Sequence, residues 1–498
     1  MSSELTNCLI DTFNREGVNY CHWKSNVDLE QAISGEMDLD FLIDRESMLP
    51  AISILSRFGY KAAEVRWGLN PPGIFHYYGY DPAIGRFVHI HLFSRVITGE
   101  SFLKSHRLPF EQMLLQNTRC IGPIKVASKP AELVLFTVRT FIKYGSIPDL
   151  LYLLKKKDKI KSELQWLKNG VDINQSICLL NKYCPVIDEE LFLQCINCLE
   201  GDGSITQRFR LAQKVRAHIR SYTKYTFLER GISYTQLVFD QVRRKLGSGG
   251  KNKVLNAGGS VIAIIGADAT GKSTLVSEMG HWLGKNLSVR ILHAGKPPTS
   301  WLTSPANLIF RLTHRYKSKL RSNNRETQYP PGGKDHDRSE KGLASLIYAL
   351  RAVTLAWDRR NLLQKGWRSA AKGEIIICDR YPSNIIGAMD SPRLQETTMR
   401  GGWFPFLYNL AAGLEKRLYT QIPPPDLVIR LHVSVETAKE RNNERDKLGE
   451  ESNEYIESRH LLSGEWHRPE VVKVFEVDTG QPLEETLQKV KDIIWQAL

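Results

Sequence analysis

A phosphate-binding loop motif follows directly on a wholly apolar segment in the second half of the chain. Residues 261–265 read Val-Ile-Ala-Ile-Ile, which favours a buried β-strand. The next residues match the pattern G-x-x-x-x-G-K-[ST] before a helical segment; they are Gly266, Ala267, Asp268, Ala269, Thr270, Gly271, Lys272, Ser273 and Thr274. A loop of this kind turns backbone N–H groups toward phosphate oxygens, next to a helix N-terminus that favours negative charge. The motif therefore predicts a P-loop domain of the α/β class.

The motif predicts chemical roles for the last residues of the loop. Lys272 is expected to reach the β- and γ-phosphates of ATP, and Ser273 to ligate Mg²⁺. A second apolar run, residues 375–378, ends in Asp379 and Arg380. The carboxyl ends of parallel strands face the ligand crevice, so we expect Asp379 to hold Mg²⁺ and Arg380 to clamp a phosphate.

Two further arginines complete the predicted catalytic set. Arg441 and Arg445 are four residues apart and share one face of a predicted helix. Such a pair can close over the phosphates and neutralise charge in the transition state. The expected catalytic residues are Lys272, Asp379, Arg380, Arg441 and Arg445, and the expected cofactors are ATP and Mg²⁺.

The rest of the chain divides by its local patterns. Strand-like runs near 261, 290, 375, 427 and 474, separated by helical stretches, predict a mainly parallel five-stranded sheet. The predicted domain organisation is a mixed α+β domain at 1–125, a helical domain at 126–246, a Gly/Ser-rich linker at 247–259, and a P-loop domain at 260–498 with an insertion at about 296–340.

Together these C-terminal residues resemble thymidylate kinases and the wider nucleoside-monophosphate kinase group, over roughly residues 258–498. The resemblance implies ATP-dependent phosphorylation of a nucleoside monophosphate, with Arg359, Arg380 and Tyr381 binding the acceptor. The chain departs from the family's pattern at Asn384, where a serine is usual. It departs again at residues 388–389 (Ala-Met), where the family reads thymine.

These departures leave the acceptor open. A thymidylate-like nucleotide, another small phosphate acceptor and a sugar or glycan all stay possible as substrates. A different class of function is a nucleotide-gated binding or scaffold protein with a degenerate acceptor site.

Two aspartates mark the N-terminal region. Asp38 and Asp40 alternate along a strand-like run and so share one face, as a two-metal nucleotidyl-transfer site requires. Residues 1–125 resemble the nucleotidyltransferase superfamily, with Lys24-Ser25 in place of its Gly-Ser turn and His89 and His91 in place of its third carboxylate. An active transferase, a degenerate ligand-binding module and a chance match remain as alternatives. The fused arrangement resembles bacterial proteins associated with surface-polysaccharide synthesis.

The net charge of +14 favours polyanionic partners. The segment 310–325 interleaves basic and apolar residues, which fits either contact with a polyanion or membrane surface or a solvated lid helix.

We expect no signal peptide and no transmembrane segment, since no apolar run reaches roughly 18 residues. The scattered cysteines are typical of reduced thiols, so we expect a cytoplasmic protein. A homodimer is a further possible partner arrangement.

Overall fold

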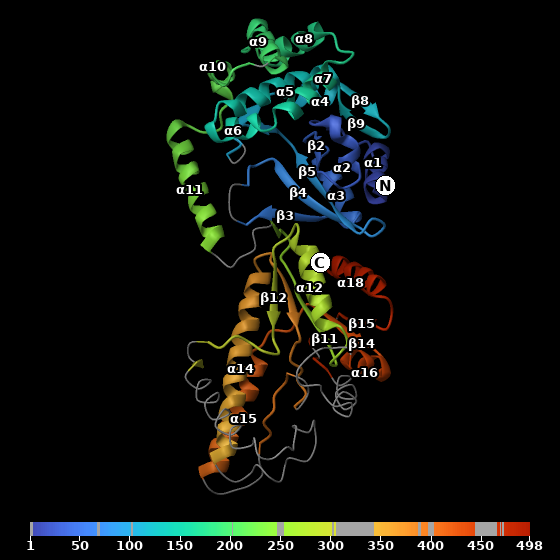
Figure 1. The fold of residues 1–498 in the computed structure, drawn as a ribbon, viewed down its shortest axis with the longest axis vertical. Helices are drawn as coiled ribbons and strands as arrows, with labels where there is room; N and C mark the ends of the chain where they lie inside the picture. The colour runs from blue at the N-terminus through green and yellow to red at the C-terminus, as the bar shows by residue number, and fades with distance from the viewer. Residues whose placement is uncertain are drawn as a thin grey trace. The chain divides into compact units, whose positions relative to one another are not determined.

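The computed structural model forms two compact units, Met1–Ser248 and Gly249–Leu498 (Figure 1). The structure describes residues 3–66, 70–100, 103–201, 203–246, 253–300, 303–304, 343–386, 390–396, 403–443, 466–468, 470 and 473–498.

The first unit is built on a mixed β-sheet with the strand order β3-β4-β5-β2-β1-β9-β8. Neighbouring strands pair antiparallel except for β2 with β5 and β1 with β9, which are parallel. The strands are β1 (Tyr20–His22), β2 (Leu39–Ile43), β3 (Lys61–Val65), β4 (Ile74–Asp81), β5 (Arg86–Phe93), β8 (Thr118–Ile121) and β9 (Ile124–Ala127), and a separate hairpin joins β6 (Val96–Thr98) to β7 (His106–Leu108).

Helices α1 (Glu4–Arg15), α2 (Leu29–Ile33) and α3 (Met48–Arg57) pack on this sheet through a common core. The short helix α4 (Glu111–Gln116) precedes β8. The strand-like run that contains Asp38 and Asp40 is observed as β2, with Asp38 one residue before its start, and His89 and His91 lie on β5.

Residues 129–246 are helical, as their patterns predict, but they do not have a core of their own. The helices are α5 (Lys129–Tyr144), α6 (Ile147–Leu154), α7 (Lys157–Lys168), α8 (Ile173–Tyr183), α9 (Glu189–Glu200), α10 (Ile205–His218) and α11 (Phe227–Leu246). Helix α5 is buried along most of its length, and one apolar cluster joins it to Trp23 and Phe93 of the sheet region. Strand β9 also crosses the predicted boundary at residue 125. The sheet and the helices therefore share one core.

The second unit contains the predicted parallel sheet of five strands, in the order β12-β13-β11-β14-β15. The strands are β11 (Val261–Gly266), β12 (Val289–His293), β13 (Ile375–Asp379), β14 (Leu427–His432) and β15 (Val474–Asp478). The central strands are apolar and almost wholly buried, as expected when helices cover both faces of a parallel sheet. The helices of this unit are α12 (Lys272–Gly284), α14 (Leu343–Ala370), α15 (Trp403–Thr420), α16 (Val435–Asn443) and α18 (Leu483–Ala497).

Two predicted segments fall partly outside the described residues. Of the predicted linker at 247–259, the described part starts at Lys253 and forms strand β10 (Lys253–Leu255), whose Leu255 N–H donates to the Gly373 carbonyl at 2.9 Å. Most of the predicted insertion at 296–340, including the basic segment 310–325, lies outside the described residues. Among the helices that are described, none is both long enough and apolar enough to cross a bilayer.

Glu132 ties the sheet to helix α5 within the shared core of the first unit. Its side chain is 1% exposed. Its carboxylate accepts hydrogen bonds from Asn26 N at 3.1 Å and Asn26 Nδ2 at 2.8 Å. Burial raises the pKa of Glu132 to about 7, although the hydrogen bonds from Asn26 act in the opposite direction.

This shift predicts a pH-dependent stability. The favourable contribution of protonated Glu132 is complete below its unfolded pKa of 4.5 and is lost as the pH rises to about 7. The free energy of unfolding of the wild type should therefore fall, relative to Glu132→Gln, by up to about 3 kcal/mol between pH 4.5 and pH 8. Urea unfolding at several pH values measures this, with Glu189→Gln at an exposed position as the control. Parallel pH profiles for the wild type and Glu132→Gln would contradict the assignment.

Candidate active site

The P-loop connects the central strand β11 to helix α12. Gly266 ends the strand with a φ of 153°, and a Cβ added there would lie 2.6 Å from the Leu431 carbonyl oxygen. Glycine is therefore required where the loop leaves the sheet. Ala269 adopts a left-handed φ of 64°, and Gly271 is the N-cap of α12. The loop thus curls back on itself directly before the helix N-terminus.

Lys272 lies folded against this loop. Its side chain is buried, and Nζ donates to the Ala267 carbonyl oxygen, which also accepts a hydrogen bond of 2.8 Å from Thr270 Oγ1. Ser273 follows in the first turn of α12 and is exposed. The ammonium and the hydroxyl are therefore held at the same helix N-terminus, where backbone N–H groups and the helix dipole favour phosphate.

Asp379 and Arg380 stand at the carboxyl end of β13, next to the P-loop strand. In the parallel register Asp379 pairs with Ile264 of β11. Arg380 has a left-handed φ of 72°, and its guanidinium lies 2.9 Å from Asp268 Oδ1 of the P-loop and 3.4 Å from Asp390 Oδ2. Burial alone would lower the pKa of Arg380, but these two carboxylates outweigh it and raise the pKa. Arg380 is therefore a charged group fixed beside the phosphate loop.

The Asp379 carboxylate suits a divalent cation. Its Oδ2 lies 3.3 Å from His293 Nδ1, whereas its Oδ1 is buried and has no hydrogen-bond partner among the described residues. A buried carboxylate oxygen normally has a partner, and a hard cation such as Mg²⁺ prefers oxygen ligands. The residues present therefore fit a magnesium ion between Asp379 and the phosphate loop.

Arg359 and Tyr381 do not have the open positions that an acceptor-binding role needs. Arg359, on α14, is fully buried, and its guanidinium donates to the Ala294 carbonyl at 2.7 Å and to Asp390 Oδ1 at 3.0 Å. It also donates to the Tyr419 hydroxyl. Tyr381 points into the core, where its hydroxyl donates to the Pro423 carbonyl. We expected both residues to bind the acceptor. Their polar atoms instead form hydrogen bonds that connect elements of the fold.

Arg441 is also engaged away from the loop. It donates from Nη2 to the Thr479 carbonyl at 2.7 Å, after β15. Its helix nevertheless contacts the P-loop, because Ala438 packs against Ala269 and Val433. The predicted partner Arg445 and residues 388–389 lie outside the described residues.

A cavity of about 580 Å³ lies between α15 and the loop that follows Arg380. Cationic, acidic and apolar side chains line it, among them Asn384, Leu394, Glu396, Lys416, Tyr419 and Arg468. Asn384 is only four residues beyond Arg380, and Tyr419 is the hydroxyl partner of Arg359.

The N-terminal candidate residues come together, but they bind one another. Lys24 Nζ lies 2.9 Å from Asp40 Oδ1, and Ser25 has a left-handed φ of 56°. Asp38 Oδ1 is 2.7 Å from His89 Nδ1, and Asp40 Oδ1 is 3.0 Å from His91 Nδ1. Burial would raise the pKa of Asp40, but the charges of Lys24 and His91 outweigh it and lower the pKa. Each aspartate thus already has cationic or imidazole partners, unlike the open pair predicted for two metal ions.

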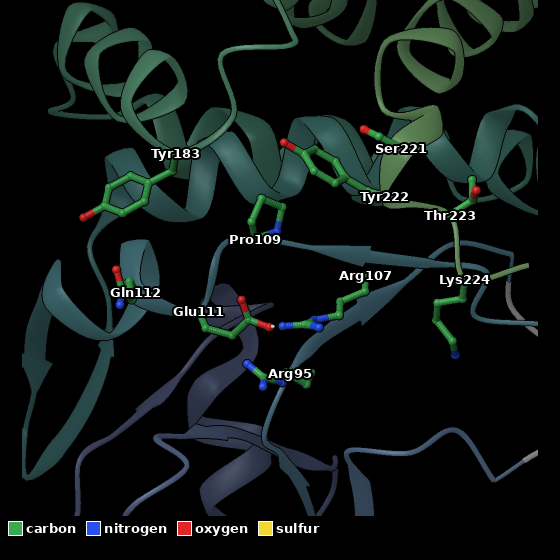
Figure 2. Close-up of a pocket in the computed structure, with 10 residues that line it drawn as sticks. All are labelled: Arg95, Arg107, Pro109, Glu111, Gln112, Tyr183, Ser221, Tyr222, Thr223 and Lys224. Atoms are coloured by element: carbon green, nitrogen blue, oxygen red, sulfur yellow. Dashed lines mark ion pairs between the residues drawn. The ribbon is translucent and has the colours of Figure 1, made fainter.

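A second cavity of about 540 Å³ lies elsewhere in the first unit (Figure 2). Arg95, Arg107 and Lys224 give it a basic lining, while Glu111 pairs with Arg107 at 3.7 Å and Tyr183 and Tyr222 add aromatic surface. No sequence pattern indicated this cavity, because its lining comes from segments more than a hundred residues apart.

Two functional candidates were missed by the sequence analysis. Asp390 forms ion pairs with both Arg359 and Arg380, but it lies in a loop whose sequence has no recognisable motif. His76 lies opposite His91 in the antiparallel register of β4 and β5. The alternation of His76 and Tyr78 along β4 was a usable signal, but only the strand pairing shows which residues they face.

Comparison with known proteins finds relatives over about half of the chain. No protein-family model matches the chain. Two proteins of Escherichia coli strain K12 named as uncharacterized ATP-binding proteins, YghS and YghR, are each 24% identical to it over 243 residues. The match covers 48% of this chain and 93% of YghS, and 47% of this chain and 86% of YghR.

Two solved structures are also similar. A deoxyadenosine kinase from M. mycoides with bound dATP has 17% identity and a TM-score of 0.26, covering 47% of this chain and 97% of its own. A thymidylate kinase from Candida albicans has 18% identity and a TM-score of 0.28, covering 48% and 92%. At these TM-scores neither structure adds to the argument. The phosphate loop on the central strand of a parallel sheet defines the second unit as a P-loop domain of the α/β class that makes up about half of the chain.

The buried position of Arg359 predicts a structural effect of its removal. Arg359→Met leaves the Asp390 carboxylate without its buried guanidinium, and breaking such a pair costs about 3–5 kcal/mol. Urea unfolding of the full chain should show this loss. Arg368→Met, at an exposed position of the same helix α14, should change stability by less than about 0.5 kcal/mol. Unchanged stability of Arg359→Met with weaker acceptor binding would instead support the acceptor role.

Proposed function

We propose that this protein is an ATP-dependent phosphotransferase of the nucleotide-kinase type. The observation that carries the proposal is the ion pair between Arg380 and Asp268, which joins the end of β13 to the phosphate loop. With this ion pair, the Arg380 guanidinium lies at the same edge of the sheet as the Asp379 carboxylate and the Lys272 ammonium of the P-loop. The ATP-binding names of the Escherichia coli relatives agree with this proposal.

Each residue has a role in transfer of the γ-phosphoryl group. Lys272 and the backbone N–H groups of the loop hold the β- and γ-phosphates, and Arg380 neutralises charge that develops on the transferred group. Arriving phosphate oxygens compete with Asp268 and Asp390 for the Arg380 guanidinium. Ser273 and Asp379 would hold Mg²⁺, which supplies further positive charge to the phosphates when bound.

We propose the cavity beside α15 as the acceptor pocket. Its lining includes Asn384, in the loop that continues from Arg380, and the cation Lys416. The mixed polar and apolar lining suits a nucleoside monophosphate, thymidylate-like or otherwise, and also a sugar or glycan acceptor. With Arg359 buried, recognition of the acceptor depends on other side chains in this pocket.

A nucleotide-gated binding or scaffold protein is a second candidate function. It is favoured by the burial of Arg359 and Tyr381, which removes two acceptor contacts that the family resemblance implied. In that case ATP would bind the loop without efficient transfer to an acceptor.

Removal of the P-loop ammonium tests the kinase proposal. Lys272→Ala should reduce ADP release by at least about a hundredfold, because one preorganised charge at the transition state contributes about 3 kcal/mol. The Lys272 ammonium donates to the Ala267 carbonyl of its own loop, and circular dichroism of the variant checks that the fold persists. Lys285→Ala, at the exposed C-terminus of the same helix, is the matched control and should keep full turnover. Equal rates in both variants would rule out this site.

A panel of acceptors separates the two candidate functions. Coupled ADP release is measured with nucleoside monophosphates and with sugars, for the wild type and for Lys416→Ala. The kinase proposal expects multiple turnovers with one acceptor class, and a KM for that acceptor about tenfold higher in Lys416→Ala with kcat little changed. ATP binding without a phosphorylated product on any acceptor would favour the binding protein.

A further inference from the structure

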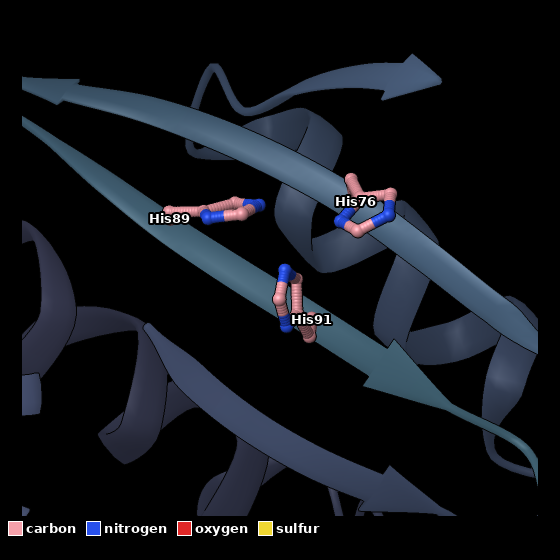
Figure 3. Close-up of side chains that lie close together, drawn as sticks. All are labelled: His76, His89 and His91. Carbon is pink, nitrogen blue, oxygen red and sulfur yellow. The ribbon is translucent and has the colours of Figure 1, made fainter. Parts of the chain in front are cut away.

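Three histidines converge on one face of the sheet in the first unit. His76 lies on β4, and His89 and His91 lie on β5 (Figure 3). In the antiparallel register His76 stands opposite His91, and Tyr78 stands opposite His89. One ring nitrogen of each histidine lies within 4.8 Å of the others. Zinc bound at about 2.0–2.1 Å from each nitrogen needs a separation near 3.4 Å, so small rotations of the side chains bring all three into range.

Two of these imidazoles already have the carboxylate partners that orient metal ligands. His89 Nδ1 lies 2.7 Å from Asp38 Oδ1, and His91 Nδ1 lies 3.0 Å from Asp40 Oδ1. A proton placed on Nδ1 by such a carboxylate leaves the Nε2 lone pair for a metal ion and makes the ring a stronger ligand. The two aspartates therefore act on the histidines and not on the metal directly.

The surroundings hold these rings in place. Tyr78 stacks on His89 with ring centroids 4.2 Å apart and an angle of 6° between the planes. Lys24 pairs with Asp40 and so fixes the carboxylate that holds His91. Asp38 is half exposed, with its Oδ2 3.8 Å from His91 Nε2, and it marks the side on which the cluster meets solvent. The rings are therefore held in place by their neighbours, with the half-exposed Asp38 at the edge of the cluster.

We propose that His76, His89 and His91 bind one zinc ion, with a fourth position open to water or a substrate. Imidazole nitrogens suit zinc, whereas magnesium prefers oxygen ligands. Three protein ligands with an open fourth position are the arrangement of catalytic rather than structural zinc sites. All residues of this site belong to the first unit.

Zinc titration of the full chain tests the proposal. The chain is first stripped with a chelator and then titrated by calorimetry. The wild type should bind one zinc ion per chain at this site. His76→Ala should lose that binding, whereas His218→Ala, which removes a histidine of helix α10 outside the cluster, should keep it. Asp38→Asn should retain binding with an affinity about 10–100-fold weaker. Retention of the wild-type stoichiometry and affinity in His76→Ala would overturn the proposal.

Cobalt substitution separates this site from the cysteines and from misfolding. The bound cobalt should give visible d–d bands of a nitrogen- and oxygen-coordinated ion with no thiolate charge-transfer band, and His89→Ala should change them. Circular dichroism and thermal unfolding of the same variants establish that they are folded. A thiolate band would place the metal on cysteine, and equally tight competition by Mg²⁺ would place it on the carboxylates. Either result would refute a three-histidine zinc site.

Discussion

The buried guanidinium of Arg359 is the interaction on which the candidate active site depends. It ties together the loop after β12, helix α15 and Asp390. Asp390 in turn holds Arg380, which is paired with Asp268 of the phosphate loop. A buried cation is stable only when its donors are satisfied, so each partner of Arg359 is constrained in position. The position of Arg380 beside the P-loop therefore depends on the contacts of Arg359 and Asp390 in the second unit.

In the first unit, charged and imidazole side chains pair with one another. Asp38 and Asp40 have the alternation of a catalytic pair, yet each one supports an imidazole, and Asp40 also pairs with Lys24. The negative charge that would attract magnesium is thereby partly neutralised. Histidines in place of the third carboxylate change the preferred metal from a hard cation to a borderline one. The same sheet face can thus hold a metal while lacking the chemistry of a two-magnesium site.

The predicted division of the first half illustrates a limit of local patterns. The spacing of apolar residues along each segment predicts helices over 126–246, and helices α5 to α11 lie between Lys129 and Leu246. A separate helical domain does not follow, because periodicity does not say what an apolar face packs against. Helix α5 is buried along most of its length, and its apolar side chains pack in one cluster with residues of the sheet and of the other helices. A helix that is buried on all sides belongs to the centre of a larger core.

The sequence alone determined the phosphate loop, the five strands of the second unit and the positions of Asp379 and Arg380 at a strand end, because these features depend on residues adjacent in the chain. Tertiary structure decided where the other candidate side chains lie. Arg359 and Tyr381 are directed into the core, Arg441 reaches Thr479, and His76 joins His89 and His91. The physical reason is that a buried polar side chain takes the position in which its donors and acceptors have hydrogen-bond partners. Those partners come from segments that only strand pairing and helix packing bring together.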